Sequence, residues 1–249
     1  MSVGSLGAEV RRSRIQELLA GDGTLDLARA ASDLGVSEMT IRRDLVELER
    51  QGLVRRVRGG AVAVEPERFE RRAARNNTAK QRIAAKLRTL VPEHGFIALD
   101  SSSTIHSLAT QLDAPGLTAL STGLETFQTI RGRVGRALLC GGDWEEATGS
   151  FVGPLAARAI ADLHFTRTFV SVTGLDPDRG IFESTIENAD IKRALRRASA
   201  SLVVAADASK LGATAAALAL PLADVDLMVT DLDPADPRLA PYADHVDLL

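Results

Sequence analysis

SEMTIRRDLVELERQGLVRRVRGGA, residues Ser37 to Ala61, holds six arginines, although the 249-residue chain as a whole carries a formal net charge of -3. Within this stretch Ile41, Leu45 and Leu48 recur at helical spacing, which predicts a helix with these residues on its buried face. Ser37 precedes the helix, where its hydroxyl can accept hydrogen bonds from free N–H groups of the first turn. The arginines are therefore expected on the flanks and outer side of this helix and on the segment after it.

Two further helical patterns and a hairpin pattern surround this helix. Apolar residues recur at helical spacing between Arg11 and Ala20 and again in LDLARAASDLGVS, residues 25–37, where Gly35 is placed to end the second helix. After the third helix, LVRRVRGGAVAV has two short apolar-containing runs around Gly59-Gly60, typical of a strand, a tight turn and a strand. Helices joined by a short turn and followed by a basic hairpin make a winged helix-turn-helix. We predict this domain over residues 1–62.

Charge is distributed unevenly between the head of the chain and its body. The first 75 residues hold 14 arginines against 12 acidic residues, whereas the remainder holds 16 basic against 21 acidic residues. Any single arginine is as often a solvated surface charge as a ligand contact. Several arginines at the start of a third helix and on the hairpin beside it can together reach base edges in the major groove and the flanking phosphates. The head is therefore predicted to bind double-stranded DNA.

Composition is that of a globular protein. The chain is 45% hydrophobic and 25% charged, and it contains neither a signal-peptide pattern nor an apolar run of the roughly 18 residues needed to span a bilayer. Cys140 is the only cysteine, which excludes an intramolecular disulfide and agrees with a reducing compartment. We therefore expect a cytoplasmic protein with no membrane partner.

The body, residues 80–249, alternates between helical and strand patterns. Apolar runs such as GFIALD, RTFVSVTG and SLVVAAD are separated by amphipathic segments such as NADIKRALRRASA, which predicts βαβ units and a mostly parallel sheet. Residues 63–79 are polar without clean periodicity, so we predict a linker whose Phe69, Arg71 and Arg72 can dock on either domain. The expected fold class is α/β: a winged helix-turn-helix followed by a mostly parallel α/β domain.

Polar or glycine-rich loops follow four of the expected strands. GFIALD runs into Ser-Ser-Ser-Thr, RALLC into two glycines, FVSVTG into Leu-Asp, and SLVVAAD into Ala-Ser-Lys. Ligands of such sheets bind beyond the carboxyl ends of the strands, so these loops are expected to offer hydroxyls and N–H groups to an anion. One Ser/Thr run alone is more often a helix cap, and the prediction therefore rests on the set.

Motifs in both the head and the body of the chain resemble those of one protein family. GVSEMTIRRDLVELERQGLVRRVRGGA resembles the signature of DeoR-family transcriptional regulators, a Ser-x-x-Thr-Ile-Arg-Arg-Asp-Leu recognition helix followed by an Arg-x-x-Gly-Gly-Ala wing. In the body, Asp100–Thr104 resembles the Asp-Ser-Gly-Thr-Thr phosphate loop of that family's sensor domain, and Asp207–Gly212 resembles its Asp-x-Ser-Lys-Phe-Gly segment. The resemblance covers nearly the whole chain. It implies a sensor domain of the ribose-5-phosphate isomerase and glucosamine-6-phosphate deaminase type.

Together with the charge pattern, the resemblance implies roles for named residues. The expected DNA contacts are Ser37, Glu38, Thr40, Arg42, Arg43, Arg55, Arg56 and Arg58. The expected effector contacts are Asp100, Ser101, Ser102, Ser103, Thr104, Thr122, Gly141, Gly142, Gly174, Asp176, Lys192, Asp207 and Lys210. Asp44 is expected to orient an arginine. The family further implies a repressor of carbohydrate metabolism genes that responds to a phosphorylated sugar or related metabolite. It is expected to act as a homo-oligomer, a dimer or a tetramer, with no cofactor and no metal.

Two positions depart from the family pattern. Ser102 replaces a glycine, which adds a side chain where a phosphate would approach the backbone. Gly123 replaces an asparagine, which removes an amide able to bond a sugar hydroxyl. These two departures are compatible with a ligand other than the usual sugar phosphates.

Lysine is rare in this chain, with four lysines against 26 arginines. A chain that uses arginine by default keeps lysine where a compact ammonium group is needed, as for a phosphate or a hydroxyl. This favours functional roles for Lys192 and Lys210, although chance explains their positions equally well.

The alternative is a sugar-phosphate isomerase or deaminase fused to a DNA-binding head. VTGLDPDRG matches the Val-Asp-Gly-Ala-Asp-Glu segment of the isomerases, with Thr173 at the first catalytic aspartate, and Ile191 falls where their catalytic glutamate would stand. Moving a proton in such a reaction needs a carboxylate base. The loss of both carboxylates favours ligand binding without turnover.

Overall fold

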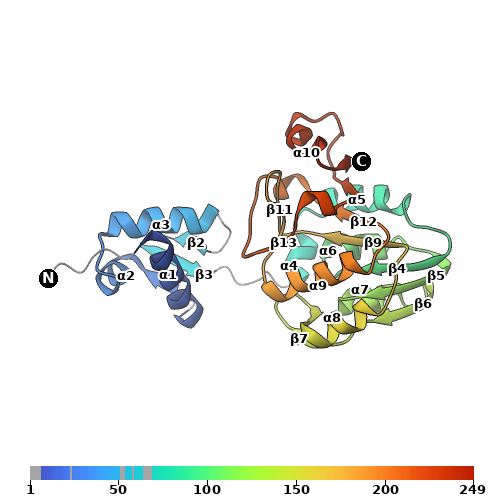
Figure 1. Ribbon diagram of the computed structural model, residues 1–249, viewed down its shortest axis with the longest axis horizontal. Helices are drawn as coiled ribbons and strands as arrows, with labels where there is room; N and C mark the ends of the chain where they lie inside the picture. The colour runs from blue at the N-terminus through green and yellow to red at the C-terminus, as the bar shows by residue number, and fades with distance from the viewer. Residues whose placement is uncertain (1–6, 23, 51–53, 58, 64–68) are drawn as a thin grey trace. The chain divides into compact units, whose positions relative to one another are not determined.

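The computed structural model describes residues 7–22, 24–50, 54–57, 59–63 and 69–249. The chain divides into two compact units, Met1–Glu65 and Pro66–Leu249, which we call the N-terminal unit and the α/β unit (Figure 1). Each unit has its own hydrophobic core. None of the helices in the described residues is long and apolar enough to cross a bilayer.

The N-terminal unit combines helices with an antiparallel sheet of strand order β1-β3-β2. Its elements are α1 (Ala8–Asp22), β1 (Thr24–Asp26), α2 (Leu27–Asp33), α3 (Glu38–Arg50), β2 (Val54–Val57) and β3 (Gly60–Ala63). Ile41, Leu45 and Leu48 of α3 are buried in one core with Ile15 of α1. The helix-turn-helix and the hairpin predicted from the sequence are confirmed.

The second helix, α2, begins at Leu27, inside the stretch predicted for it, because the preceding residues Thr24–Asp26 form the unpredicted strand β1. Leu25 pairs with Ala61 of β3, and the carboxylate of Asp26 accepts a hydrogen bond from the Arg29 N–H at 2.9 Å, which caps α2. Gly60 permits this pairing, since a Cβ there would lie 1.8 Å from the Leu25 carbonyl oxygen. A strand this short, whose partner follows two helices later, leaves no periodic signal in the sequence.

Local contacts fix the orientation of α3. Gly35 has a φ of +64°, the left-handed conformation predicted for the end of the preceding helix. The Ser37 hydroxyl accepts from the Thr40 N–H at 3.2 Å and thereby caps α3. Buried Asp44 receives two hydrogen bonds from Arg11 of α1, from Nε at 2.5 Å and from Nη2 at 3.1 Å. Asp44 therefore has the expected role of orienting an arginine, and this ion pair ties α3 to α1.

The α/β unit is built on a parallel seven-stranded sheet of order β15-β14-β12-β9-β4-β5-β6. Its strands are β4 (Gly95–Leu99), β5 (Ala114–Ser121), β6 (Val134–Leu139), β9 (Arg167–Ser171), β12 (Leu202–Ala205), β14 (Leu227–Val229) and β15 (Asp247–Leu248). The predicted α/β fold with a mostly parallel sheet is confirmed.

Helices cover both faces of this sheet. One face carries α5 (Asn77–Arg88), α6 (Ser103–Ala109) and α7 (Leu124–Ile130), and the other carries α8 (Gly153–Ala161) and α9 (Ile186–Arg197). Successive side chains of a strand point to opposite faces. Leu99 of β4 accordingly packs in one core with Ile83 of α5, whereas Ala98 lies in the other core with Leu195 of α9. The unit is therefore doubly wound.

Several short elements of the α/β unit are not predicted by the sequence patterns. A second, antiparallel sheet has the order β10-β11-β13, and β7 pairs with β8 in a hairpin. These elements are β7 (Asp143–Glu145), β8 (Ser150–Val152), β10 (Gly174–Asp176), β11 (Gly180–Glu183), β13 (Ala217–Leu220), the 3-10 turns η1 (Ala208–Lys210), η2 (Leu222–Asp224) and η3 (Pro237–Leu239), and α10 (Ala240–Ala243). The antiparallel sheet brings Glu183 next to α9, as described below.

The segment predicted to be a linker, residues 63–79, contains α4 (Phe69–Ala74) and the start of α5. The buried Phe69 ring stands edge-on to the His106 ring of α6, with 5.2 Å between ring centroids. Arg72 donates a hydrogen bond to the Thr148 carbonyl. Phe69 and Arg72 therefore dock on the α/β unit, one of the two alternatives that the sequence left undecided.

Candidate functional site

Helix α3 and the Ser37 cap before it hold five of the eight residues predicted to contact DNA. Arg42 and Arg43 are exposed, as is Glu38 in the first turn. The hydroxyls of Ser37 and Thr40 lie 2.9 Å apart at the start of the helix. Exposed guanidinium groups on the helix that follows a short interhelical turn are the groups with which helix-turn-helix proteins reach base edges.

The β2–β3 hairpin adds two more exposed cations. Arg55 and Arg56 are neighbours on β2 and therefore point to opposite sides of the strand. The carboxylate of Glu49 on α3 accepts hydrogen bonds from the backbone N–H of Arg56 at 2.9 Å and from its Nε at 2.5 Å. These two bonds lower the pKa of Glu49. Arg58, also predicted to contact DNA, lies outside the described residues.

In the α/β unit, the carboxyl ends of the parallel strands bring the predicted effector loops together. The strand order β12-β9-β4-β5-β6 makes the following loops neighbours along one sheet edge. Backbone bonds continue past the strands, from Asp100 N to the Phe169 carbonyl at 3.1 Å and from Thr122 N to the Leu99 carbonyl at 3.1 Å. The loops that hold Asp100 and Thr122 are therefore adjacent.

A buried ion-pair network lies at the centre of this edge. The Nζ of Lys192 on α9 is 2.8 Å from Asp100 Oδ2 and 3.1 Å from Glu183 Oε1. Burial lowers the pKa of Lys192, but the charges and hydrogen bonds of Asp100 and Glu183 outweigh this effect, so the pKa is raised above its ordinary value. Two carboxylates already balance the ammonium charge. Lys192 therefore holds the site's loops together and is not an unpaired cation for a phosphate.

The carboxylates of this network also organise the backbone around them. Asp100 accepts hydrogen bonds from the N–H groups of Ser171 at 2.8 Å and Ser102 at 2.9 Å. Glu183 accepts from the Thr173 hydroxyl at 3.2 Å. The ends of β4 and β9 are thereby joined to β11 from the second sheet. Contacts within the chain therefore set the geometry of this edge.

The serine-rich loop after β4 is largely buried. Ser101, Ser103 and Thr104 are all buried, whereas Ser102 is half-buried. The Ser102 hydroxyl accepts from the Ile105 N–H at 3.1 Å and so caps α6. The Ser102 side chain, which stands where the family pattern has a glycine, therefore caps α6.

Gly123, the other departure from the family pattern, packs directly against the same loop. A Cβ at Gly123 would lie 2.7 Å from the Ser101 Cα, closer than atoms approach without movement. An asparagine at this position would require the loop to shift. Thr122 beside it is buried, and its carbonyl accepts from the Phe151 N–H at 2.8 Å. The two departures are thus neighbours in space and shape one part of the edge.

The remaining glycines and Asp176 have architectural contacts. Gly141 and Gly142 have φ values of +68° and +112°, and a Cβ at Gly142 would lie 2.6 Å from a carbonyl oxygen of β8. A Cβ at Gly174 would lie 2.4 Å from the Ala213 carbonyl oxygen. The Asp176 carboxylate accepts from two N–H groups of its own turn at 3.0 and 3.1 Å. Effector contact by these four residues stays a prediction.

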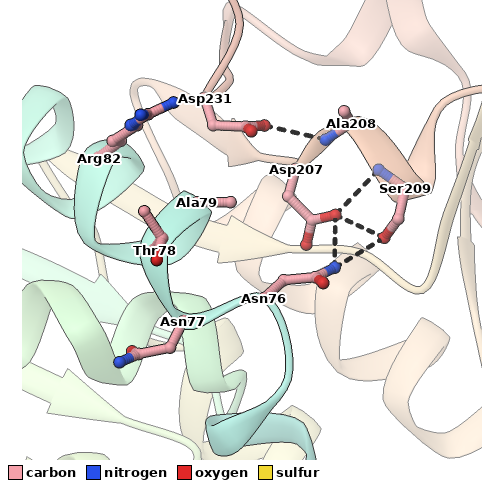
Figure 2. Close-up of a pocket in the computed structure, with 9 residues that line it drawn as sticks. All are labelled: Asn76, Asn77, Thr78, Ala79, Arg82, Asp207, Ala208, Ser209 and Asp231. Atoms are coloured by element: carbon pink, nitrogen blue, oxygen red, sulfur yellow. Dashed lines mark hydrogen bonds between the residues drawn. The ribbon is translucent and has the colours of Figure 1, made fainter.

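A pocket opens beside η1, where β12 ends (Figure 2). It is lined by Asn76, Asn77, Thr78, Ala79, Arg82, Asp207, Ala208, Ser209 and Asp231. Asn76 Nδ2 donates to Asp207 Oδ1 at 3.2 Å and to Ser209 Oγ at 3.3 Å. Of the predicted effector residues, Asp207 lines this pocket, and Lys210 ends the η1 turn beside it.

Sequence reasoning missed Glu183, Asn76 and Arg82. Asn76 is the one described residue other than glycine with a positive φ, 53°, and the Asn-Asn pair in a polar segment is a turn signal that could have located it. Arg82 lies on the amphipathic α5, and nothing local distinguishes it from other helical arginines. Glu183 lies on β11, a strand that the sequence patterns do not predict. The sequence therefore gave no indication that Glu183 is a partner of Lys192.

A winged helix-turn-helix with an exposed arginine face, followed by an α/β unit with polar loops at one sheet edge, defines a DNA-binding regulator with a ligand-sensing domain. The DeoR-like helix-turn-helix domain matches residues 11–67, and the DeoR C terminal sensor domain matches residues 75–232. The chain belongs to the DeoR family of transcriptional regulators. This membership confirms the resemblance seen in the sequence and decides against the isomerase or deaminase alternative.

Curated relatives match the chain over nearly its full length. It is 32% identical over 228 residues to the transcriptional repressor AccR of Agrobacterium fabrum, covering 89% of this chain and 88% of the relative. It is 28% identical over 249 residues to the lactose phosphotransferase system repressor of Streptococcus mutans, covering 96% and 99%. Among solved structures, ribose 5-phosphate isomerase A of Methanocaldococcus jannaschii matches 54% of each chain with a TM-score of 0.40 and 12% identity.

Proposed function

We propose that this chain binds operator DNA in the cytoplasm as a dimer and represses genes of carbohydrate metabolism. In this proposal it leaves the DNA when a phosphorylated sugar or a related anion binds the α/β unit. The observation that carries the DNA part is the exposed Arg42–Arg43 face of α3 in a winged helix-turn-helix. Dimers suit operators that are read as paired half-sites. The name of the streptococcal relative, a lactose phosphotransferase system repressor, supports a link to sugars.

The chemistry of the pocket beside η1 supports a polyhydroxylated anion as effector. Asn76, Asp207 and Ser209 offer an amide, a carboxylate and a hydroxyl, which together can bond donors and acceptors of sugar hydroxyls. Arg82 supplies a guanidinium group of the kind that binds phosphate. The neighbouring Asp100–Lys192 ion pair fixes the adjacent loops, so the ligand meets a preorganised edge.

The position of Asn76 suggests how a ligand would change DNA binding. Asn76 forms the turn between α5 and α4, the first helix after the boundary of the two units. Its left-handed conformation is unfavourable for a residue other than glycine, and its side chain bonds to Asp207 and Ser209 hold it. A ligand that takes over Asp207 or Ser209 would release this turn and shift the arrangement of α4.

A ligand panel on the purified full chain tests this proposal. Pentose and hexose phosphates, their free sugars and inorganic phosphate are screened for thermal stabilisation and for release of DNA from the gene's own upstream region. We expect at least one phosphorylated sugar to raise the melting temperature and release the DNA, with no effect of its free sugar. Asn76→Gly keeps the left-handed turn and lacks the amide, so it should bind DNA normally and respond to the same ligand more weakly.

The two halves of the proposal can fail separately. Absence of sequence-specific DNA binding contradicts the operator part. Specific DNA binding that no phosphorylated sugar alters contradicts the effector part. A response to the sugar that Asn76→Gly leaves unchanged contradicts the role of the Asn76 turn alone.

A further inference from the structure

The outermost side of α3 is partly apolar. Met39 and Val46 are 60% and 48% exposed, and the exposed Arg43 lies between them. Positions 39, 43 and 46 have the spacing i, i+4 and i+7, so they form one stripe along the helix. This stripe faces away from the buried stripe of α3. Two apolar side chains therefore occupy the side of the helix that projects farthest from its own core.

The packing of the N-terminal unit does not account for Met39. The core formed by Ile15, Ile41, Leu45 and Leu48 leaves each of these side chains at most 1% exposed, so it is closed without Met39. Isolated exposed apolar residues are common on protein surfaces. Met39 differs in its position, because it is the second residue of α3, in the turn with which a recognition helix contacts base edges.

The surroundings of Met39 indicate what covers it. Arg42 and Arg43 are exposed on the same helix, so a polyanion is the surface with complementary charge. Along the major groove of DNA, the base edges present hydrogen-bonding groups and one apolar group, the C5-methyl of thymine. A flexible thioether side chain beside two guanidinium groups fits that combination.

We propose that Met39 determines sequence specificity by packing on a thymine methyl group in each operator half-site. Arg43, one helical turn further along, binds the edge of a nearby base, for which guanine is the usual partner of arginine. The half-site therefore contains a thymine close to the base that Arg43 reads. This inference rests on the proposed operator binding and adds the base and the chemical group that one residue recognises.

Removal of single methyl groups from the DNA tests the inference. Duplexes that bind the full chain are selected from a random pool, and each thymine of the selected half-site is replaced in turn by deoxyuridine, which lacks only the methyl. At one position we expect wild-type binding to weaken about fourfold per half-site, the effect of leaving one methyl-sized group in water. Met39→Ala should bind the thymine site more weakly than the wild type and no longer distinguish thymine from deoxyuridine there.

Val10→Ala is the matched control, because Val10 is 57% exposed on α1 of the same unit. It should keep the full methyl dependence. If the chain selects no sequence, the proposed operator binding fails, and this inference falls with it. If a site is selected but Met39→Ala keeps the wild-type methyl dependence, this inference alone is overturned. A changed oligomer mass or melting temperature with unchanged methyl dependence overturns it too, because Met39 then contacts protein.

Discussion

The two units use their cations in opposite ways. In the N-terminal unit Arg42 and Arg43 are exposed, and neither has an ion-pair partner among the described residues. In the α/β unit Lys192 is buried between two carboxylates. An exposed guanidinium keeps its charge for a polyanion outside the protein, whereas a buried, compensated ammonium stabilises the arrangement of its own loops. A cation in a predicted binding site is therefore a ligand contact or an internal support depending on its burial and partners.

Lys192→Met should give the largest effect, and it should fall on stability. Removing one member of a buried ion pair leaves uncompensated charge in the core, which costs about 3 to 5 kcal/mol. Urea unfolding followed in the α/β unit measures this loss. Arg197→Met, an exposed position on the same helix, should stay within about 0.5 kcal/mol of the wild type. Equal effects of the two variants would contradict the supporting role of Lys192.

Arg43→Ala should show the reverse pattern, with a loss of DNA affinity and no loss of stability. If Arg43 reads a base, its removal costs about 1 to 3 kcal/mol and relaxes specificity at that base pair. Arg42→Ala is expected to fall in the same range if it too contacts a base. Operator titrations against single-base variants measure both quantities. Arg14→Ala removes the same charge from an exposed site on α1 and should change affinity little. An unchanged operator affinity for both Arg42→Ala and Arg43→Ala would remove the proposed docking mode.

Sequence reasoning succeeded where the determining contacts are local. The stripe of Ile41, Leu45 and Leu48 and the Ser37 cap lie within one helix, so periodicity and capping rules identify α3. Likewise, a parallel sheet places its strand ends on one edge, which is why the loop of Asp100 could be predicted to lie beside the other strand-end loops.

Prediction from the sequence failed where segments distant in the chain contact each other. Leu25 is in a strand because Ala61 pairs with it, and no pattern near Leu25 records that partner. The rarity of lysine suggested Lys192 as a contact for a phosphate or a hydroxyl, whereas its partners in the structure are the carboxylates of Asp100 and Glu183. Composition can single out a residue, whereas only the tertiary structure shows which charges it faces.

The β2–β3 hairpin shows the same contrast between a cation with an ion-pair partner and one without. The effects of replacing these two arginines on DNA binding should be smaller. Arg55 has no ion-pair partner among the described residues, while Glu49 binds Arg56. If Arg55 contacts phosphate, Arg55→Ala should weaken binding to all sequences alike and reduce the salt slope of log K by about 1. Arg56→Ala should reduce that slope less, because Glu49 already offsets the Arg56 charge. Binding titrations over a range of salt concentrations compare them, and a larger slope change for Arg56→Ala would contradict this assignment.

The smallest expected effect concerns pH and belongs to the α/β unit alone, since all four histidines lie there. Burial lowers the pKa of His106 below its ordinary 6.5. Between that lowered pKa and 6.5 the unfolded chain binds more protons than the folded chain, so stability falls as pH drops below about 6.5. The loss levels off once the folded histidine is protonated.

Melting temperatures of the wild type and His106→Gln between pH 7.5 and 5 isolate this term. Glutamine can keep a hydrogen bond to the Thr129 hydroxyl, which lies 3.0 Å from His106 Nε2, and it does not titrate. The acidic groups titrate alike in both proteins, so the wild type should lose slightly more stability than the variant as pH falls. Because the His106 ring contacts Phe69, the excess loss should include release of α4. Parallel pH profiles for the two proteins would show that His106 does not link protonation to the docking of this helix.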